Sequence, residues 1–452
     1  MATGLARASV RHRRGGFLAG FLSVFLGAAI LMAFASMLDT AGGPGVHGTD
    51  RTTLTIMAMV VGGWGAIVVA SAVGTTLAVA SRQRAAELAL LRSLGATPGQ
   101  AVRLVVGEVA LVGAAGALLA IPFGYGGGYG LLRILQDTDQ VHHGIGYRFG
   151  TAALAVGAGG CLLAALAAAW ITARRTAHRR VRDAQLDAAG GGHRTSRFRL
   201  VAGVVLVLAG ANCAVLTATV VDGKQLQSQS VAGEGAILSS IGFALLAPVI
   251  LRAAVAVLGP LLETLGAGGQ LGVLGVRRRL QRAATPMMPI VVCTAISVGT
   301  LYMQAIWNSA HPVMNADDKS TATLNYVVVG MLAVFAAVML VNLIVADTSA
   351  RHREFAQLRL TGATPRQILR LVGAETVLTL VTGVLFGSLA ALLSIVPYSL
   401  AVTDKAVPDT SPGIYVAVVA GVAVLTLAAG LGSARRTTRV PATAVLRGAV
   451  AS

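Results

Sequence analysis

The charged residues with the most informative spacing lie in a stretch that occurs twice. Residues 84–108 read RAAELALLRSLGATPGQAVRLVVGE, and residues 351–375 read RHREFAQLRLTGATPRQILRLVGAE. At an offset of 267 residues, 14 of the 25 positions are identical. Each copy places a glutamate between two arginines near its start and a second glutamate at its end. Carboxylates and guanidinium groups form strong charge-assisted ion pairs, so ion pairing is the chemistry we expect from these residues.

The first part of each copy predicts a short amphipathic helix, followed by a tight turn and a new helix. In the first copy, Leu88, Leu91 and Leu94 form an apolar stripe at three-residue spacing. Gly95 is typical of a helix C-cap, and Thr97-Pro98 is typical of a helix start. A single copy could be an ordinary basic loop along lipid headgroups, but self-similarity over so long a period indicates two copies of a whole domain.

Motifs for bond-making chemistry are absent from the sequence. It contains no G-x-x-x-x-G-K-[ST], no H-E-x-x-H and no C-x-x-C. His142 and His143 follow Asp137 and Asp139, which is conceivable as a metal site, but a solvated loop is the favoured interpretation. We therefore expect no enzyme activity and no cofactor or metal in this chain, and any ATP and Mg²⁺ would be bound by a partner.

The composition is that of a polytopic membrane protein. The chain has 452 residues, of which 55% are hydrophobic and 12% are charged, about half the charged share of a soluble domain. The three cysteines, Cys161, Cys213 and Cys293, fall inside apolar runs and indicate no disulfide framework.

Ten apolar runs are long enough to cross the roughly 30 Å of a bilayer core as helices. The first resembles a signal peptide, but it is too long for a typical hydrophobic region of one, so we expect a first span. The fold class we predict is an all-α protein with ten transmembrane helices. The runs lie near residues 17–38, 54–80, 104–131, 149–172, 199–221, 236–258, 287–307, 323–347, 370–397 and 413–433.

The distribution of Lys and Arg predicts the orientation. With the N-terminus inside, the inner segments carry 29 of the 36 basic residues, and the outer loops carry six. The net charge of +18 is therefore a topology signal and a contact with lipid headgroups. Nucleic acid is not expected as a partner, because the basic residues are spread over six segments without interleaved aromatics. We expect both termini to be cytoplasmic, in the plasma membrane.

These patterns predict two parallel four-helix repeats joined by two linking helices. The first repeat would span residues 1–180, the linker with its two spans 181–265, and the second repeat 266–452. The ends of the repeats also match, since Ala173-Arg174-Arg175-Thr176 corresponds to Ala434-Arg435-Arg436-Thr437. The loops after the first and seventh spans are too short to fold as external domains.

The duplicated pattern resembles the FtsX-like permease family, the membrane subunits of mechanotransmission-class ABC transporters. The resemblance covers roughly residues 54–175 and 323–447, and it implies that residues 84–94 and 351–361 are coupling helices docked on a cytoplasmic ATPase. The positions that match the motif are Arg84, Glu87, Leu88, Leu91, Arg92 and Gly95 in the first copy, and Arg351, Glu354, Phe355, Leu358, Arg359 and Gly362 in the second.

The glutamate that ends each copy has two interpretations. Glu108 and Glu375 follow Arg103 and Arg370 by about one helical turn. They could form local structural ion pairs with these arginines. Alternatively, they fix the coupling helices rigidly to the third and ninth spans, so that ATPase motion is transmitted.

The resemblance implies a permease that exports or extracts a hydrophobic or amphiphilic substrate, such as an antimicrobial compound or a lipid-like molecule. Its partners would be two copies of a cytoplasmic ATPase, membrane lipid and that substrate. The alternative is a non-transporting signal transducer that acts on an external cell-wall hydrolase. The short external loops count against this second role.

Overall fold

The computed structural model describes residues 14–63, 95–138, 140–177, 197–219, 226–264, 266–311 and 351–439, with isolated positions between 65 and 90 and between 322 and 344. Within these residues the chain forms helices and no strand, which agrees with the predicted all-α class. Eight of the described helices are long and apolar enough to cross a membrane. They coincide with eight of the ten predicted spans. Of the other two runs, 54–80 is described at residues 54–63 and at isolated positions beyond them, and 323–347 lies largely outside the described residues.

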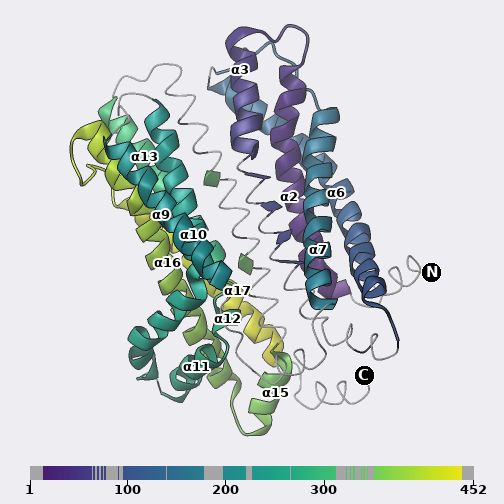
Figure 1. Ribbon diagram of the computed structural model, residues 1–452, viewed down its shortest axis with the longest axis vertical. Helices are drawn as coiled ribbons and strands as arrows, with labels where there is room; N and C mark the ends of the chain where they lie inside the picture. Colours follow the sequence, from purple (N-terminus) through teal and green to yellow (C-terminus); the bar gives the residue numbers. More distant parts are fainter. Residues whose placement is uncertain are drawn as a thin grey trace. The chain divides into compact units, whose positions relative to one another are not determined.

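The chain divides into two compact units. The helices of the first unit are α2 (Arg14–Ala41), α3 (Gly48–Ile56), the π-helical turn η1 (Met57–Val61), α6 (Pro98–Asp137), η2 (Ala153–Gly159) and α7 (Gly160–Ala177). Those of the second are α9 (Arg197–Thr219), α10 (Leu226–Glu263), α11 (Ala267–Arg278), α12 (Leu280–Ala283), α13 (Met287–Ala310), α15 (His352–Leu360), α16 (Pro365–Thr403) and α17 (Gly413–Arg439). Figure 1 labels most of them.

Helices α2 and α6 of the first unit approach closely because α6 presents small residues to α2. A Cβ atom on Gly116 would lie 3.3 Å from the carbonyl oxygen of Phe21, and one on Gly124 would lie 2.7 Å from the Cβ of Met32. Such close backbone approach is how helices gain packing energy in lipid, where burial of apolar surface adds little.

The equivalent pair in the second unit, α13 and α16, packs in the same way. Gly383, which is 267 residues after Gly116, faces Ile290, and a Cβ atom there would lie 2.6 Å from that side chain. Gly387 likewise faces Thr294. The two units therefore share one mode of packing, between α2 and α6 in the first unit and between α13 and α16 in the second.

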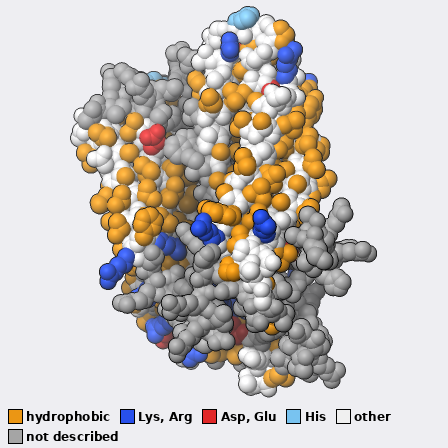
Figure 2. Space-filling model, turned by 45° about the vertical axis from the view of Figure 1, so that its right-hand side comes forward, with side chains coloured by type: hydrophobic (Ala, Val, Ile, Leu, Met, Phe, Trp, Pro, Cys, Tyr) orange, Lys and Arg blue, Asp and Glu red, His pale blue; other side chains and the backbone are white. Residues whose placement is uncertain are grey.

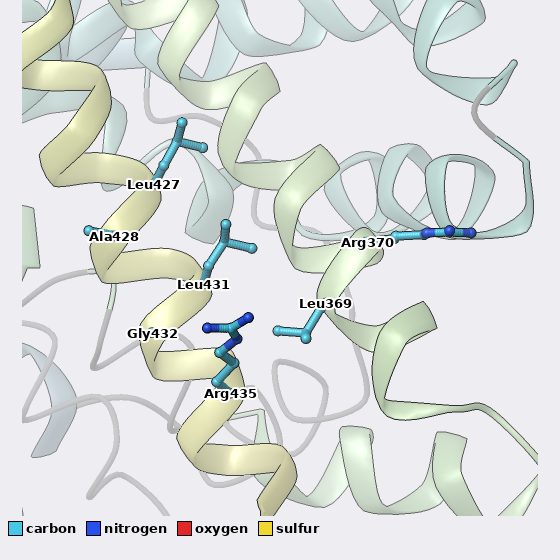
Figure 3. Close-up of a pocket in the computed structure, with 7 residues that line it drawn as sticks. All are labelled: Leu369, Arg370, Leu427, Ala428, Leu431, Gly432 and Arg435. Atoms are coloured by element: carbon cyan, nitrogen blue, oxygen red, sulfur yellow. The ribbon is translucent and has the colours of Figure 1, made fainter.

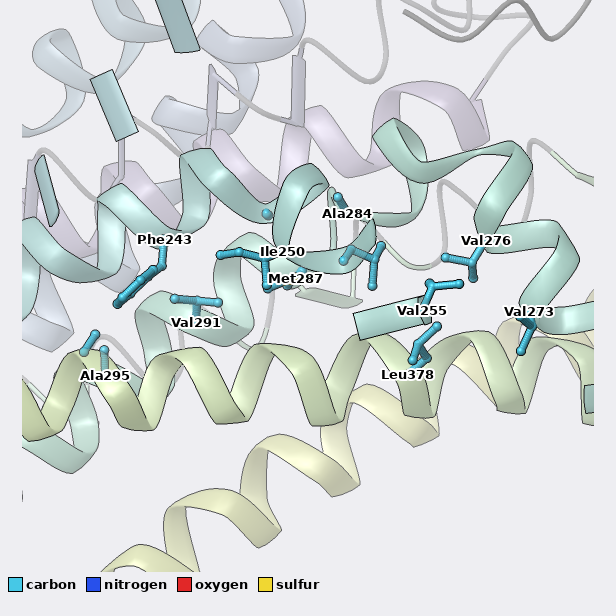
Figure 4. Close-up of a cluster of buried hydrophobic side chains, with 13 residues drawn as sticks. Phe243, Ile250, Val255, Val273, Val276, Ala284, Met287, Val291, Ala295 and Leu378 are labelled. Carbon is cyan, nitrogen blue, oxygen red and sulfur yellow. The ribbon is translucent and has the colours of Figure 1, made fainter. Parts of the chain in front are cut away.

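The two linking helices, α9 and α10, belong to the second unit and pack against α13 and α16. Figure 4 shows the buried cluster that results, in which Phe243 and Val255 of α10 meet Met287 and Val291 of α13 and Leu378 of α16. The cluster therefore joins α10, which the sequence assigns to the linker at 181–265, to α13 and α16, which it assigns to the second repeat at 266–452.

The surfaces of the helices are apolar, as a lipid-facing surface requires. Figure 2 shows a broad field of hydrophobic side chains on one face, with Lys and Arg side chains toward its upper and lower margins. The exposed hydrophobic side chains of α6 include Leu118, Leu119 and Phe123. This arrangement agrees with a multi-pass membrane protein.

Candidate functional site

The G-A-T-P turns adopt the same conformation in both copies. Gly95 has a φ of 96° and Gly362 has a φ of 97°. Residues other than glycine rarely adopt this region of backbone conformation. In the second copy this glycine ends the short helix α15, and Thr364 then begins α16. The prediction of a C-cap glycine followed by a new helix is confirmed for these described residues.

The start of each long helix is closed by a reciprocal capping box. The Thr97 amide donates to Oε1 of Gln100 at 2.9 Å, and the Gln100 amide donates to Oγ1 of Thr97 at 3.3 Å. Thr364 and Gln367 repeat this geometry, at 2.8 and 3.3 Å. Two of the amides that a helix start leaves unbonded are thereby satisfied. Both α6 and α16 thus begin at a fixed residue.

Helix α15 is held on its apolar side by α16 and α17. Phe355 is fully buried and packs in a cluster with Ile368 and Leu371 of α16 and Ala434 of α17. Leu358 is partly buried against the same cluster. The guanidinium of Arg359 adds a hydrogen bond of 3.1 Å to the carbonyl oxygen of Thr438. Phe355 and Leu358, the α15 positions equivalent to Leu88 and Leu91, therefore face the chain's own helices, whereas the predicted stripe itself lies outside the described residues.

Arg351, directly before α15, binds Glu375 of α16 through two hydrogen bonds. Nη2 lies 3.1 Å from Oε1, and Nη1 contacts Oε2. The Arg351 side chain is only 8% exposed, and its guanidinium lies 4.9 Å from the centre of the Phe355 ring. A paired guanidinium and carboxylate in two-point contact is a strong and directional interaction.

This pairing differs from the local pair with Arg370 considered from the sequence. Arg370 is exposed and forms no ion pair with any described residue. The pair with Arg351 joins positions 24 residues apart, so it connects two helices instead of two turns of one helix. Sequence proximity favoured Arg370, but residues at that spacing need not face each other on a helix.

Glu354 extends the pair into a chain of four charged side chains. Its Oε1 accepts from Nη2 of Arg279 at 2.7 Å, and its Oε2 lies 3.4 Å from Nε of Arg351. We call Arg279, Glu354, Arg351 and Glu375 the ion-pair chain. It joins the junction between α11 and α12, the helix α15 and the N-terminal part of α16.

Helix α11 lies close to this chain because its glycines allow it. A Cβ atom on Gly272 would lie 3.0 Å from the Cβ of Ala374, and one on Gly275 would collide with Oε1 of Glu375. Figure 1 shows α11, α12 and α15 at the same end of the second unit. The site is therefore a helix fastened to a membrane span by charge pairs on one side and a small apolar cluster on the other.

The remaining predicted site residues are described only in part. In the first copy, Arg84, Glu87, Leu88, Leu91 and Arg92 lie outside the described residues. Glu108 is 2% exposed and Arg103 is exposed. The equivalent of Glu375 is thus also buried in the first unit.

Sequence reasoning missed Arg279. A signal for it exists, because Val276-Arg277-x-Arg279 matches Val10-Arg11-x-Arg13 at an offset of 266 residues. That match extends the repeat upstream of the first span.

The described residues contain no cluster of metal-ligating side chains. His142 lies in an exposed loop, where its Nδ1 is 3.3 Å from Asp50. The arrangement at α15 holds charges in place and can transmit force, but it offers no nucleophile beside a base.

Comparison with known families agrees with the duplicated pattern. The family model described as FtsX-like permease C-terminal matches residues 59–181 and 326–442, together more than half of the chain. The matches include both G-A-T-P turns and both buried glutamates. No curated protein sequence matches the chain.

Proposed function

This chain belongs to the FtsX-like permease family, and from that premise we propose that it is the membrane subunit of an ABC transporter that moves a hydrophobic or amphiphilic substrate. Helix α15 and its first-copy equivalent would be coupling helices that dock on a cytoplasmic ATPase. The chain itself would hydrolyse no ATP.

The observation that carries this proposal is the ion-pair chain. A surface helix that only lined the membrane would not need two-point charge pairing to a span. Arg351 and Glu375 are both largely buried, and Glu354 links them to Arg279. Separating the two groups would leave an uncompensated charge in a buried position, which is costly. The contact between α15 and α16 should therefore resist separation. Movement of α15 would therefore be passed to α16 and α11 and not absorbed.

The surface left for the ATPase is the side of α15 away from this joint. Leu360 is 58% exposed, and Gln357 and Thr361 are exposed beside it. In the first copy, Leu90 is 64% exposed and occupies the position equivalent to Gln357. Exposed leucines on such a helix are apolar surface that a partner protein can cover. We assign the contact to these positions, whereas Phe355 and Leu358 hold the helix to the permease.

Several finer points belong to the same proposal. Ten spans, with both termini in the cytoplasm, follow from the apolar runs and the Lys and Arg distribution. Export from the membrane or its outer leaflet, with an antimicrobial or lipid-like substrate, rests on the resemblance and on the short external loops. On the same resemblance, the first, second, seventh and eighth spans would line the substrate path.

The alternative of a non-transporting signal transducer is favoured less. That role requires a surface for an external hydrolase. The described outer loop at residues 140–152 is fastened to α2 by Asp39, which accepts hydrogen bonds from the amides of Gly150, Ala152 and Ala153 at 2.8–2.9 Å. A short, tied loop offers little area for docking a protein.

The test is co-purification of the permease with the ATPase encoded nearest to it. Leu360→Asp places a charge on the exposed side of α15, so we expect the amount of bound ATPase to fall roughly tenfold or more. Val407→Asp, at an exposed position in a loop outside α15, is the control and should leave the complex intact. Equal recovery of the ATPase with Leu360→Asp would contradict the assigned contact.

A further inference from the structure

We propose that a groove between the inner ends of α16 and α17 binds one anionic phospholipid. The proposal rests on the proposed function only in naming the lipid leaflet as the cytoplasmic one. The groove lies entirely within the second unit, next to the end of α16 that carries the ion-pair chain.

The groove is a cavity of about 550 Å³. Cavities that hold small organic ligands measure roughly 300–1,000 Å³. One wall is a single face of α17, since its residues recur at helical spacing, and the other wall is the first turns of α16. The lining residues are Leu369, Arg370, Leu427, Ala428, Leu431, Gly432 and Arg435.

The polarity of the groove changes along its length. Leu427 lies deeper in the span and Arg435 lies eight residues nearer its end, a rise of about 12 Å along the helix. Figure 3 shows Leu369 and Arg435 directed toward each other across the gap. An apolar channel that ends at a cation has the polarity of a phospholipid standing in one leaflet, with its acyl chain inward and its phosphate at the surface.

Arg435 supplies the charge of this groove. In Figure 3 the Arg370 side chain points away from α17. Its Cβ faces α11, where a Cβ atom on Gly268 would lie 2.9 Å from it. Arg435 is exposed, and no described carboxylate forms an ion pair with it. A guanidinium matches a phosphate group in two-point contact, and basic pockets between spans on the cytoplasmic side favour acidic headgroups.

The first unit lacks the space for the same ligand. At the offset that aligns Arg174 with Arg435, Trp170 replaces Leu431 and Ile171 replaces Gly432. The guanidinium of Arg174 lies 5.1 Å from the centre of the Trp170 ring. Larger side chains therefore stand where the groove would be, and the cation is already in contact with a ring. Within the residues that the structure describes, the lipid site is thus assigned to the second unit.

The test uses the full-length chain in nanodiscs of phosphatidylcholine that contain a small fraction of photoreactive phosphatidylglycerol. After illumination, labelled peptides are quantified by mass spectrometry. We expect labelling around residues 427–435 to exceed that around residues 166–174. Unlabelled phosphatidylglycerol should compete, whereas phosphatidylcholine and inorganic phosphate should not.

Arg435→Gln removes the charge from an exposed position and should lower the labelling around residues 427–435 roughly tenfold. Gly432→Ile copies the first unit and should lower it similarly, while Arg174→Gln should have no effect at that site. Recovery of the ATPase complex shows that each variant is folded. Equal labelling by the two lipids, competition by free phosphate, or unchanged labelling in Arg435→Gln would each overturn the lipid site. Loss of ATPase binding with intact lipid labelling would count against the proposed function alone.

Discussion

At the scale of single residues, the most consequential contact is that between Arg351 and Glu375. Both groups are largely buried, and each makes hydrogen bonds to the other. A buried charge that loses its partner is costly, whereas the same charge at the surface costs little. The contact therefore makes the position of α15 sensitive to changes that leave its exposed face untouched.

Glu375→Gln should weaken this joint while retaining the shape of the side chain. We expect a loss of about 2–4 kcal/mol in the local stability of α15 on α16, because the largely buried Arg351 would lose its two-point contact with a carboxylate. ATP hydrolysis by the bound ATPase should continue, and transport should fall. Hydrogen exchange of residues 351–361, measured beside ATPase and transport assays, checks this.

Arg370→Gln is the matched control for Glu375→Gln, since Arg370 is on the same helix, is exposed, and lies outside the ion-pair chain. Its exchange rates and transport should match those of the unaltered chain. If Glu375→Gln abolished ATPase binding and left exchange of α15 unchanged, the residue would be part of the docking surface and not of the joint.

A second prediction at this scale concerns Gly362, the glycine of the turn after α15. Gly362→Ala forces a side chain into a backbone region with a φ of 97°, although nothing lies within 4 Å of the new Cβ atom. The expected cost is about 1–2 kcal/mol of strain, seen as a lower midpoint in thermal unfolding in detergent. Gly99→Ala, at an open position inside α6, should be neutral or stabilising. Equal midpoints for both variants would contradict the requirement for glycine.

At the scale of elements, the sequence predicts the features that depend on residues close together in the chain. The G-A-T-P turn, the starts of α6 and α16 and the eight described spans follow from caps, glycine and apolar length. The partner of Glu375 did not follow, because it depends on how α15 folds back on α16. Arg279 was missed for the same reason, since its contact with Glu354 crosses 75 residues.

Leu88 and Leu91 of the predicted apolar stripe lie outside the described residues, but their equivalents in the second copy lie on α15. Phe355 and Leu358 face the chain's own α16 and α17, and the exposed positions are Gln357 and Leu360. A periodic pattern shows that a helix has an apolar face, and it does not say which body covers that face. Only the arrangement of α15, α16 and α17 shows that Leu358 packs against the chain's own helices and that Leu360 is exposed.

At the scale of the whole molecule, the duplication makes a prediction about stoichiometry. Both copies carry the turn, the capping box and the glutamate, so we propose that one chain offers two coupling helices. ABC ATPases act as dimers, and we expect one permease to bind two ATPase subunits. Native mass measurement of the detergent-purified complex checks this ratio. Two permeases with two ATPases would contradict it.

The two proposed docking sites should also differ in their affinity for the ATPase. Leu90 corresponds to Gln357, and Leu94 corresponds to Thr361, so the first copy is the more apolar. Leu90→Asp and Gln357→Asp therefore form a matched pair, in which the change at Leu90 should reduce ATPase recovery more.

The close pairing of α9 and α10 bears on how the protein is made. Gly203 and Gly210 of α9 lie against Gly242 and Gly235 of α10, and Arg199 reaches the carbonyl oxygen of Leu245 at 2.9 Å. These contacts join segments that leave the ribosome one after the other, before α13 and α16 leave it. The hairpin can thus assemble first in the bilayer and present a finished surface, onto which the later spans add in the order of their synthesis.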